Sequence, residues 1–272
     1  MNPNSFRFYR PCPALSPYVR FYWTLYTTEA LSALTFPTAC LQLIFHVGTP
    51  LYVPELAVSQ SPLTISGQVD YPAHLCTQGE TKMIVVVFQP YGFRAFFSAP
   101  AAELYNLEIS GFDLGDRSLE ELAATIAECG NEETAVAQIE NWLLTRLATL
   151  PGKDFYHIKR IRSVVDLLLS TPSVTVMEMA EAACLTVKHL ERVFAATVGA
   201  SPKVYARMVR FQRSLALMQR GYGDNSLTQI AYRCGYADQS HFIREFRQFS
   251  GHTPTSLRKS IAPYSDLFTN PV

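Results

Sequence analysis

The spacing of hydrophobic and polar residues changes along the chain, from a period of two near the start to a helical period later. From position 19 onward, Val19, Phe21, Trp23 and Leu25 alternate with other residues, which predicts a strand with these four side chains on one face. Further strands are predicted for apolar runs bounded by Pro and Gly, at 41–47 and 82–88, and more weakly at 63–69. The first hundred or so residues therefore indicate a β-rich domain.

Helical spacing begins near Ser118. Ser118 and Glu121 have the spacing of a capping box, and they open a stretch whose apolar stripe is Leu119, Leu122, Ala123 and Ile126. After Cys129–Asn131, a second helix is predicted at 132–147, with Val136, Ile139, Leu143 and Leu147 on one side. The resulting helical hairpin, at about 118–149, would either form a dimerisation surface or cover an open edge of the β structure.

The most informative pattern lies at 226–258, where two short helices are predicted with a tight turn between them. Ser226 and Asp238 are good N-cap residues, and Gly235 tolerates the left-handed backbone that a sharp turn needs. In the second helix, aromatic residues at i, i+4 and i+7 must face a core; they are Phe242, Phe246 and Phe249.

The opposite side of that second helix carries Gln239, Ser240, His241 and Arg244. A short helix with an apolar back and these polar residues at its front end suits the major groove of DNA. The alternative is a solvated polar face on an ordinary helical hairpin.

The same pattern occurs a second time, upstream. Arg192 and Arg244 are 244 − 192 = 52 positions apart, and the same offset relates Phe194 to Phe246, Gly199 to Gly251 and Pro202 to Pro254. A helix from Pro202 to Arg220, capped by Ser201, joins the two units, and 221–225 ends it. An internal repeat of this kind indicates that the unit itself is used, and two units can enter successive major-groove segments about 34 Å apart.

Residues from about 157 to 260 resemble the DNA-binding domain of AraC/XylS-family transcription regulators. The residues that carry the resemblance in the second unit are Ile230, Ala231, Gly235, Tyr236, Asp238, Ser240, His241, Phe242, Arg244, Phe246, Gly251, Pro254 and Arg258. Those in the first unit are Leu190, Arg192, Phe194, Gly199, Ser201, Pro202, Tyr205 and Arg210. The sequence departs from the family pattern at Thr186, Lys188 and Ser214, which bears on the base preference of the first recognition helix.

The predicted fold class is α+β. The first domain, at 1–150, is β-rich, is similar to a cupin-like or jelly-roll-like barrel, and carries the hairpin. A linker at 151–156 leads to an all-α domain at 157–262, which consists of two helix-turn-helix units joined by a long helix. The chain ends in a tail at 263–272. The barrel follows from a second resemblance, because the segments ALSPYVRFYW and LQLIFHVG look like parts of a sensor domain that accompanies some of these regulators.

Eight residues are predicted to contact DNA because helix geometry turns them outward: Val187, Lys188, Glu191, Arg192, Gln239, Ser240, His241 and Arg244. Gln can pair with adenine and Arg with guanine, whereas Arg192 and Arg244 can instead grip phosphates. A third alternative for these two arginines is a structural ion pair with Glu178, Glu181 or Glu245.

Charge is unevenly divided, although the whole chain is formally neutral. Residues 1–150 hold 7 Lys and Arg against 14 Asp and Glu, a net charge of −7, and residues 151–272 hold 16 against 9, a net charge of +7. This asymmetry favours a basic module for nucleic acid beside an acidic module with another task.

The six cysteines form no C-x-x-C pair, which excludes a zinc or disulfide framework and favours a reducing compartment. The first residues lack the layout of a secretory signal, and no apolar run approaches the roughly 20 residues that span a bilayer. A cytoplasmic protein without membrane contact is therefore expected.

Aromatic residues are concentrated in the β-rich part, with 19 of 33 before position 113. They either enclose a ligand pocket or simply fill the barrel. The candidate ligand contacts are Trp23, Phe45, His46, His74 and Tyr91. Because no H-x-H motif is present, neither a metal site nor a cofactor is predicted.

Three classes of function are consistent with these patterns. The first is a transcription regulator that responds to a small apolar or aromatic-contacting effector; the family resemblance adds double-stranded DNA, RNA polymerase and a homodimer as partners. The second is a regulator whose β-domain serves only dimerisation or protein partners. The third is a DNA-repair enzyme with a reactive cysteine, but Cys12, Cys40 and Cys76 lack an activating setting, and no catalytic residues are predicted.

Overall fold

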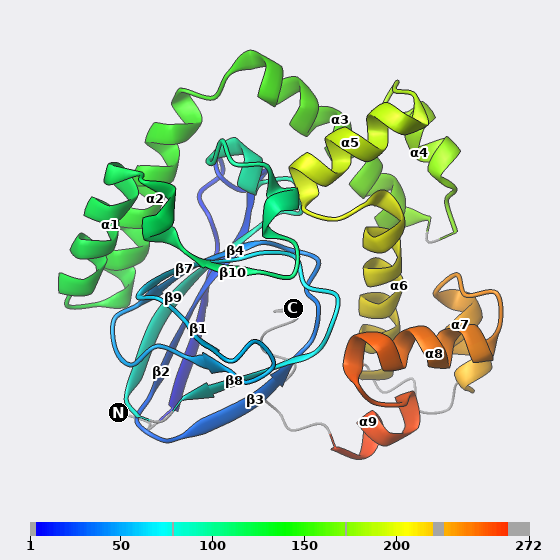
Figure 1. Cartoon of the computed structure of the whole chain (residues 1–272), viewed down its shortest axis with the longest axis horizontal. Helices are drawn as coiled ribbons and strands as arrows, with labels where there is room; N and C mark the ends of the chain where they lie inside the picture. The colour runs from blue at the N-terminus through cyan, green and yellow to red at the C-terminus, as the bar shows by residue number, and fades with distance from the viewer. Residues whose placement is uncertain (1–3, 78, 172, 220–225, 261–272) are drawn as a thin grey trace.

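The computed structural model describes residues 4–77, 79–171, 173–219 and 226–260. A β-rich part comes first and a set of helices follows it (Figure 1), so the α+β class and this order of domains are confirmed. Arg220, the predicted helix end at 221–225 and the predicted tail at 263–272 lie outside the described residues.

Two antiparallel sheets build the β-rich part. The larger has the strand order β1 (Asn4–Tyr9), β2 (Val19–Thr27), β9 (Thr81–Phe88), β4 (Gln42–His46), β7 (Leu63–Ser66) and β10 (Glu108–Ser110). The smaller has the order β3 (Leu31–Thr35), β8 (Ala73–Thr77), β5 (Tyr52–Val53) and β6 (Val58–Ser59). The four predicted strands, β2, β4, β7 and β9, are confirmed and lie side by side with β10 and β1 at the ends.

The central strands of the larger sheet are buried on both faces. Along β9, Met83 and Val85 pack in the apolar cluster shared with the smaller sheet, whereas Ile84 and Val86 pack in the cluster shared with the helices. Strands with two buried faces read as continuous apolar runs rather than as alternating ones. This is why the central strands could be recognised in the sequence.

A register shift in β2 corrects one prediction. The pairing of β2 with β9 is irregular between Val19 and Phe21. As a result Val19 packs on the helical side of the sheet, while Phe21, Trp23 and Leu25 pack toward the smaller sheet. The expectation that all four share one face was wrong because a β-bulge reverses the side-chain direction.

The helical hairpin, α1 (Arg117–Glu128) and α2 (Glu132–Ala148), covers a face of the larger sheet and not an open edge. Its apolar stripes lie in the same cluster as the sheet residues Leu43 and Phe45. At the start of α2, Glu132 accepts hydrogen bonds from Tyr9 (3.0 Å) and Thr24 (2.9 Å) of the sheet. The outer side of the hairpin is polar, so any contact made there would not use these stripes.

The N-cap of α1 is Asp116, and the predicted capping box of Ser118 with Glu121 is wrong. The Asp116 carboxylate accepts from the backbone N–H of Leu119 (3.3 Å) and from the Ser118 hydroxyl (2.8 Å). A carboxylate at this position satisfies an otherwise unpaired N–H and also favours the positive end of the helix dipole.

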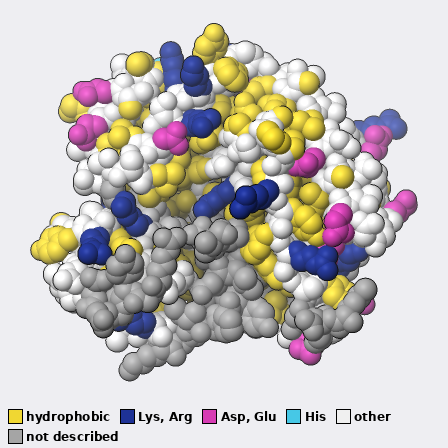
Figure 2. Space-filling model, turned by 180° about the vertical axis from the view of Figure 1, so that it is seen from behind, with side chains coloured by type: hydrophobic (Ala, Val, Ile, Leu, Met, Phe, Trp, Pro, Cys, Tyr) yellow, Lys and Arg dark blue, Asp and Glu magenta, His cyan; other side chains and the backbone are white. Residues whose placement is uncertain are grey.

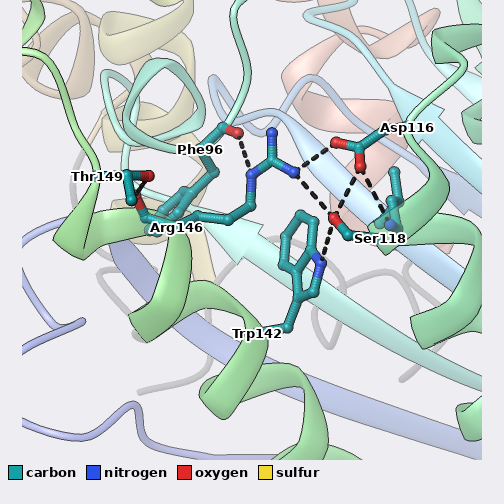
Figure 3. A network of polar contacts seen from close by, with 7 residues as sticks. Phe96, Asp116, Ser118, Trp142, Arg146 and Thr149 are labelled. Carbon is teal, nitrogen blue, oxygen red and sulfur yellow. Dashed lines mark hydrogen bonds and ion pairs between the residues drawn. The ribbon is translucent and has the colours of Figure 1, made fainter.

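Arg146 of α2 links the hairpin to the segment that follows β9 (Figure 3). Its guanidinium donates to the carbonyl of Phe96 (2.7 Å) and to the carboxylate of Asp116, and it lies over the Trp142 ring at 4.7 Å. Phe96 follows the short 3-10 helix η1 (Phe93–Ala95). The interaction therefore joins three segments that are far apart in sequence.

The C-terminal helices begin earlier than predicted. Helix α3 (Gly152–Ser170) starts at Gly152, so most of the expected linker at 151–156 is helical. The remaining helices are α4 (Val176–Ala182), α5 (Val187–Val198), α6 (Pro202–Gln219), α7 (Leu227–Arg233), α8 (Gln239–Ser250) and α9 (Pro254–Ser260). The start of α3 is held to the β-rich part by an ion pair between Arg94 and the mostly buried Asp154 (3.1 Å).

Prediction for Arg146. We expect Arg146→Ala to lower the free energy of unfolding by about 1–3 kcal/mol, because it leaves the Oδ2 of the partly buried Asp116 and the Phe96 carbonyl without the guanidinium that donates to them. The measurement is urea unfolding of the full chain. The matched control is Arg117→Ala. The side chains of Arg117 and of its ion-pair partner Glu121 are 90% and 66% exposed, so a change of less than about 0.5 kcal/mol is expected. Equal effects of the two substitutions would contradict the structural role of Arg146.

Candidate nucleic-acid interface

The second helix-turn-helix unit forms as its sequence predicts. The Ser226 hydroxyl accepts from the N–H of Gln229 (3.3 Å), and Asp238 accepts from the N–H of His241 (2.7 Å). Between the two helices, Gly235 has φ +82°, the left-handed region in which only glycine is unstrained. Both N-caps and the turn residue are therefore where the pattern placed them.

The aromatic underside of α8 attaches it to α6. Phe242, Phe246 and Phe249 are completely buried. The Phe211 ring of α6 lies 5.2 Å from Phe246 and 5.4 Å from Phe249, between ring centroids. Because the underside of α8 is fixed in this way, its opposite side is directed away from the core.

The first unit repeats this geometry with one difference in the turn. The N–H of Leu185 donates to the Ala180 carbonyl (2.9 Å), as the N–H of Tyr236 does to Ala231 (3.0 Å). These pairs are 51 positions apart, whereas the N-caps Thr186 and Asp238 are 52 apart, so Ala237 is the additional residue of the second turn.

Cys184 occupies the place of Gly235 in the first turn. Its φ is +52°, a left-handed conformation that strains a residue with a Cβ by about 1 kcal/mol or more. The first turn therefore has the conformation of the second without its glycine.

In the first unit, all four predicted DNA contacts are solvent-exposed. Val187, Lys188, Glu191 and Arg192 lie on the outer side of α5. The inner side is buried, as predicted, through Leu190, Val193 and Phe194.

In the second unit, Ser240 and Arg244 are exposed, while Gln239 and His241 are half-buried. The Oε1 of Gln239 accepts from the Thr228 hydroxyl (2.6 Å), which leaves its amide N–H groups as donors. The ring of His241 stands edge-on to Tyr236, with 5.4 Å between centroids. None of the eight predicted contacts is enclosed in the body of the molecule.

The structural ion pair considered for Arg192 and Arg244 is not found among the ion pairs of the described residues. The carboxylate proposed as the partner of Arg244 belongs to Glu245, which points to the other side of α8. Its side chain is only 4% exposed and pairs with Arg207 at 2.7 Å and Arg210 at 3.2 Å, both on α6. His241 lies 3.7 Å from the same carboxylate.

This charged cluster, formed by Glu245, Arg207 and Arg210, is a second attachment of α8 to α6. Arg207 also donates to the Gln248 side chain and lies over the Phe249 ring at 5.2 Å. The equivalent of Glu245 in the first unit, 52 positions earlier, is the buried Val193. The two recognition helices are thus held by different interactions.

Two further residues on the outer side of α8 were not predicted from the sequence. Arg247 and Gln248 line a shallow surface hollow together with Ser240, Ile243, Arg244 and Thr253. Arg247 lies three residues after Arg244 and seven after Ser240, a spacing that places all three on one helix face. This spacing is the sequence signal from which Arg247 could have been predicted.

From behind, Lys and Arg side chains are visible over the C-terminal helices and also on the β-rich half, with hydrophobic side chains between them on both (Figure 2). The exposed basic groups of α5 and α8 belong to the part of the chain that carries the net positive charge. A surface of this kind favours a polyanionic partner.

Of the five predicted ligand contacts, Trp23 lines a cavity between the two sheets. Phe45 is buried in the cluster on the opposite side of the larger sheet, and Tyr91 belongs to the same cluster. His74 lies at the surface of β8, where its Nδ1 is 2.6 Å from a Glu55 oxygen. The structure does not bring these five residues together.

The fifth residue, His46, is buried next to the cavity. Burial lowers the pKa of His46 to about 4, and a hydrogen bond to Gln60 (2.8 Å) opposes this shift. Gln60 itself lines the cavity. Its amide nitrogen donates to both carboxylate oxygens of Glu108, at 3.0 and 2.9 Å. Neither Gln60 nor Glu108 was selected from the sequence.

Metal binding and cysteine-based catalysis have little support in the described part of the chain. No group of three or more His, Cys, Asp or Glu side chains there has metal-binding geometry. Burial raises the pKa of the Cys40 thiol and raises that of Cys234 to about 11, so neither is an activated nucleophile. The described helices include none with the length and hydropathy of a membrane span.

Comparison with protein families gives two matches. Residues 179–260 match a family described as a helix-turn-helix domain. Residues 7–110 match a family described as a domain of unknown function, DUF6597. The two matches coincide with the helical module and with the two sheets.

Individual relatives match different shares of the chain. The HTH-type transcriptional activator RhaS of Yersinia pestis is 33% identical over 84 residues, 31% of this chain and 30% of RhaS. The C-terminal domain of AraT from Geobacillus stearothermophilus is 21% identical, with a TM-score of 0.35 over 39% of this chain and 91% of that domain. ToxT from Vibrio cholerae is 12% identical, with a TM-score of 0.44 over 95% of this chain and 98% of its own. The chain spans less than a third of the length of curated relatives such as RhaS.

Prediction for the charged cluster. We expect Glu245→Gln to destabilise the chain by about 1–3 kcal/mol, because it leaves two partly buried arginines without a counter-charge. The measurement is the loss of unfolding free energy in urea, and Glu191→Gln on the exposed side of α5 is the control, with a change within about 0.5 kcal/mol. A neutral effect of Glu245→Gln would contradict the attachment of α8 through this cluster.

Proposed function

We propose that this chain, whose residues 179–260 match a helix-turn-helix family, is a sequence-specific DNA-binding regulator of transcription of the AraC type. In this proposal α5 and α8 are the two recognition helices and α6 fixes their separation. The N-terminal domain receives a small-molecule signal and changes how the two helices are presented to DNA.

One observation carries the proposal: both helices have an aromatic or aliphatic underside buried against the core and a polar outer side open to solvent. On α5 the open groups include Lys188 and Arg192, and on α8 they include Ser240, Arg244 and Arg247. Lys and Arg neutralise phosphates, and Arg also reads guanine in the major groove. A solvated hairpin of purely structural purpose would not need this arrangement twice.

A route for the signal is supported by the contacts between the β-rich part and α6. Phe36 lines the cavity between the sheets, and its ring also meets the ring of Phe211 edge-on, at 6.0 Å. The next residue, Pro37, accepts a hydrogen bond from Gln212 through its carbonyl. Since Phe211 also touches two rings of α8, a ligand that moves Phe36 would act on the second recognition helix.

The loop that carries Phe36 and Pro37 is short and strained. Ala39 has φ +58°, which a residue with a Cβ adopts only when its surroundings enforce it. Both Thr38 and Cys40 line the cavity on one side and a second hollow against α6 on the other. A loop with cavity and helix on its two sides is suited to transmitting a change between them.

Further parts of the proposal come from the family resemblance. They are double-stranded DNA as the target, RNA polymerase as a partner and a homodimer as the active form. The apolar stripes of α1 and α2 are buried against the sheet, so a dimer formed through this hairpin would use its polar outer side.

Prediction for Arg244. Selection of bound sequences from random DNA, with the purified full chain, defines a preferred site. On that site we expect Arg244→Ala to weaken binding by about 1–3 kcal/mol if Arg244 reads a base, with a much smaller loss on unrelated DNA. Binding is measured for both duplexes at several salt concentrations.

The control for Arg244 is Lys153→Ala, which removes one exposed positive charge at the start of α3. An equal loss on both duplexes with a shallower salt slope would show that Arg244 contacts a phosphate. Failure of the unaltered chain to enrich any sequence would overturn the proposed function.

A further inference from the structure

The two sheets enclose a cavity of about 70 Å³. We infer that it binds a small organic cation, an alkylammonium or guanidinium group, with Glu108 as the counter-ion; this rests on the proposed function, because it names the chemical class of that effector. The class differs from the apolar alternative expected from the sequence and falls within the aromatic-contacting one.

The wall of the cavity carries one acidic group and no basic one among its described residues. Glu108, on β10, supplies the carboxylate, and the remaining lining residues are apolar or polar without charge. Burial raises the pKa of two lining groups, the Cys40 thiol and the Tyr71 phenol, so neither contributes a negative charge. In the described part of the chain, no ion pair neutralises Glu108.

A chain of hydrogen bonds orients the carboxylate as an acceptor. His46 is neutral near pH 7 because its pKa is lowered to about 4, and its Nε2 lies 2.8 Å from the Oε1 of Gln60. With Nε2–H donating to that oxygen, the Gln60 amide N–H is directed at Glu108, at 2.9 and 3.0 Å. A carboxylate has about four acceptor sites, so a ligand can still donate to it.

The free-energy cost of burying the charged carboxylate of Glu108 favours a cation bound next to it. Burial raises the pKa of Glu108, and hydrogen bonds from Gln60 and Ser66 oppose this shift. An ionised carboxylate removed from water is costly unless a positive charge and hydrogen-bond donors compensate for it. A bound ammonium or guanidinium group would supply both, whereas a neutral molecule would supply donors alone.

Aromatic side chains on the same wall add a second preference for positive charge. Trp23, Phe36 and Tyr71 line the cavity with Glu108. The face of an aromatic ring attracts a cation through its quadrupole, and the attraction grows when the site is desolvated. Carboxylate and rings together select a cation over an anion or a neutral molecule of equal size.

The size of the cavity limits the ligand. An engineered cavity of about 150 Å³ in another protein holds benzene, so a cavity of about half that volume holds a group of about three or four heavy atoms. Ethylammonium and guanidinium have that size. Each has a neutral counterpart of nearly the same shape, ethanol and urea, which separates the effect of charge from that of size.

The experiment uses the purified full chain with these four compounds at about 10 mM and constant ionic strength. We expect ethylammonium and guanidinium to raise the melting temperature by about 3 °C for a dissociation constant of about 1 mM, and ethanol and urea to leave it unchanged. An equal response to the charged and neutral members of each pair would overturn the inference.

Two variants test the role of Glu108. Glu108→Gln keeps the shape and removes the charge, and it should weaken binding of both cations at least tenfold. Glu103→Gln, an exposed carboxylate of the same domain, should leave that binding unchanged. Binding retained in Glu108→Gln would contradict the assignment, and Glu108→Asp, with reduced but measurable cation binding, checks the result with a variant that keeps the charge.

Failure of this inference is distinguishable from failure of the proposed function. Sequence-selective DNA binding is measured on the same preparations without any ligand. A chain that selects DNA but ignores the cations loses only the ligand class, and a chain that binds the cations without selecting DNA loses the proposed regulatory role.

Discussion

The ring of Phe211 is a point at which the β-rich part, α6 and α8 all meet. It is completely buried at the middle of α6, with Phe36 of the β-rich part on one side and Phe246 and Phe249 of α8 on the other. Close-packed interiors transmit displacement because they contain few voids to absorb it. The orientation of the second recognition helix therefore depends on a contact with the domain that encloses the cavity.

The helical module could be predicted in detail because its signals are local. Caps such as Ser226 and Asp238, the turn at Gly235 and the phenylalanine stripe of α8 depend on residues only a few positions apart. The 52-residue repeat then showed that the unit occurs twice. Contacts between helices were less accessible: nothing in the spacing distinguished Glu245, which is buried with two arginines of α6, from an exposed carboxylate.

The β-rich part was predicted only where strands are buried on both faces. Short or exposed strands such as β8 and β10 lack a continuous apolar run, and Glu108 of the cavity lies on one of them. A β-bulge turned the Val19 side chain to the opposite face of the sheet, and a bulge of this kind cannot be recognised from composition. Residues such as Trp23 and Phe45 look alike in sequence, yet they lie on opposite sides of one sheet, so the list of ligand contacts could not be assembled without the register.

Because buried Val193 of α5 corresponds to Glu245 of α8, the two helices are not held alike. Hydrophobic contacts are non-directional, whereas the hydrogen bonds of a carboxylate to two guanidinium groups also fix an angle. The rotation of α8 about its own axis is therefore more closely constrained than that of α5, and the two units of the repeat are not interchangeable.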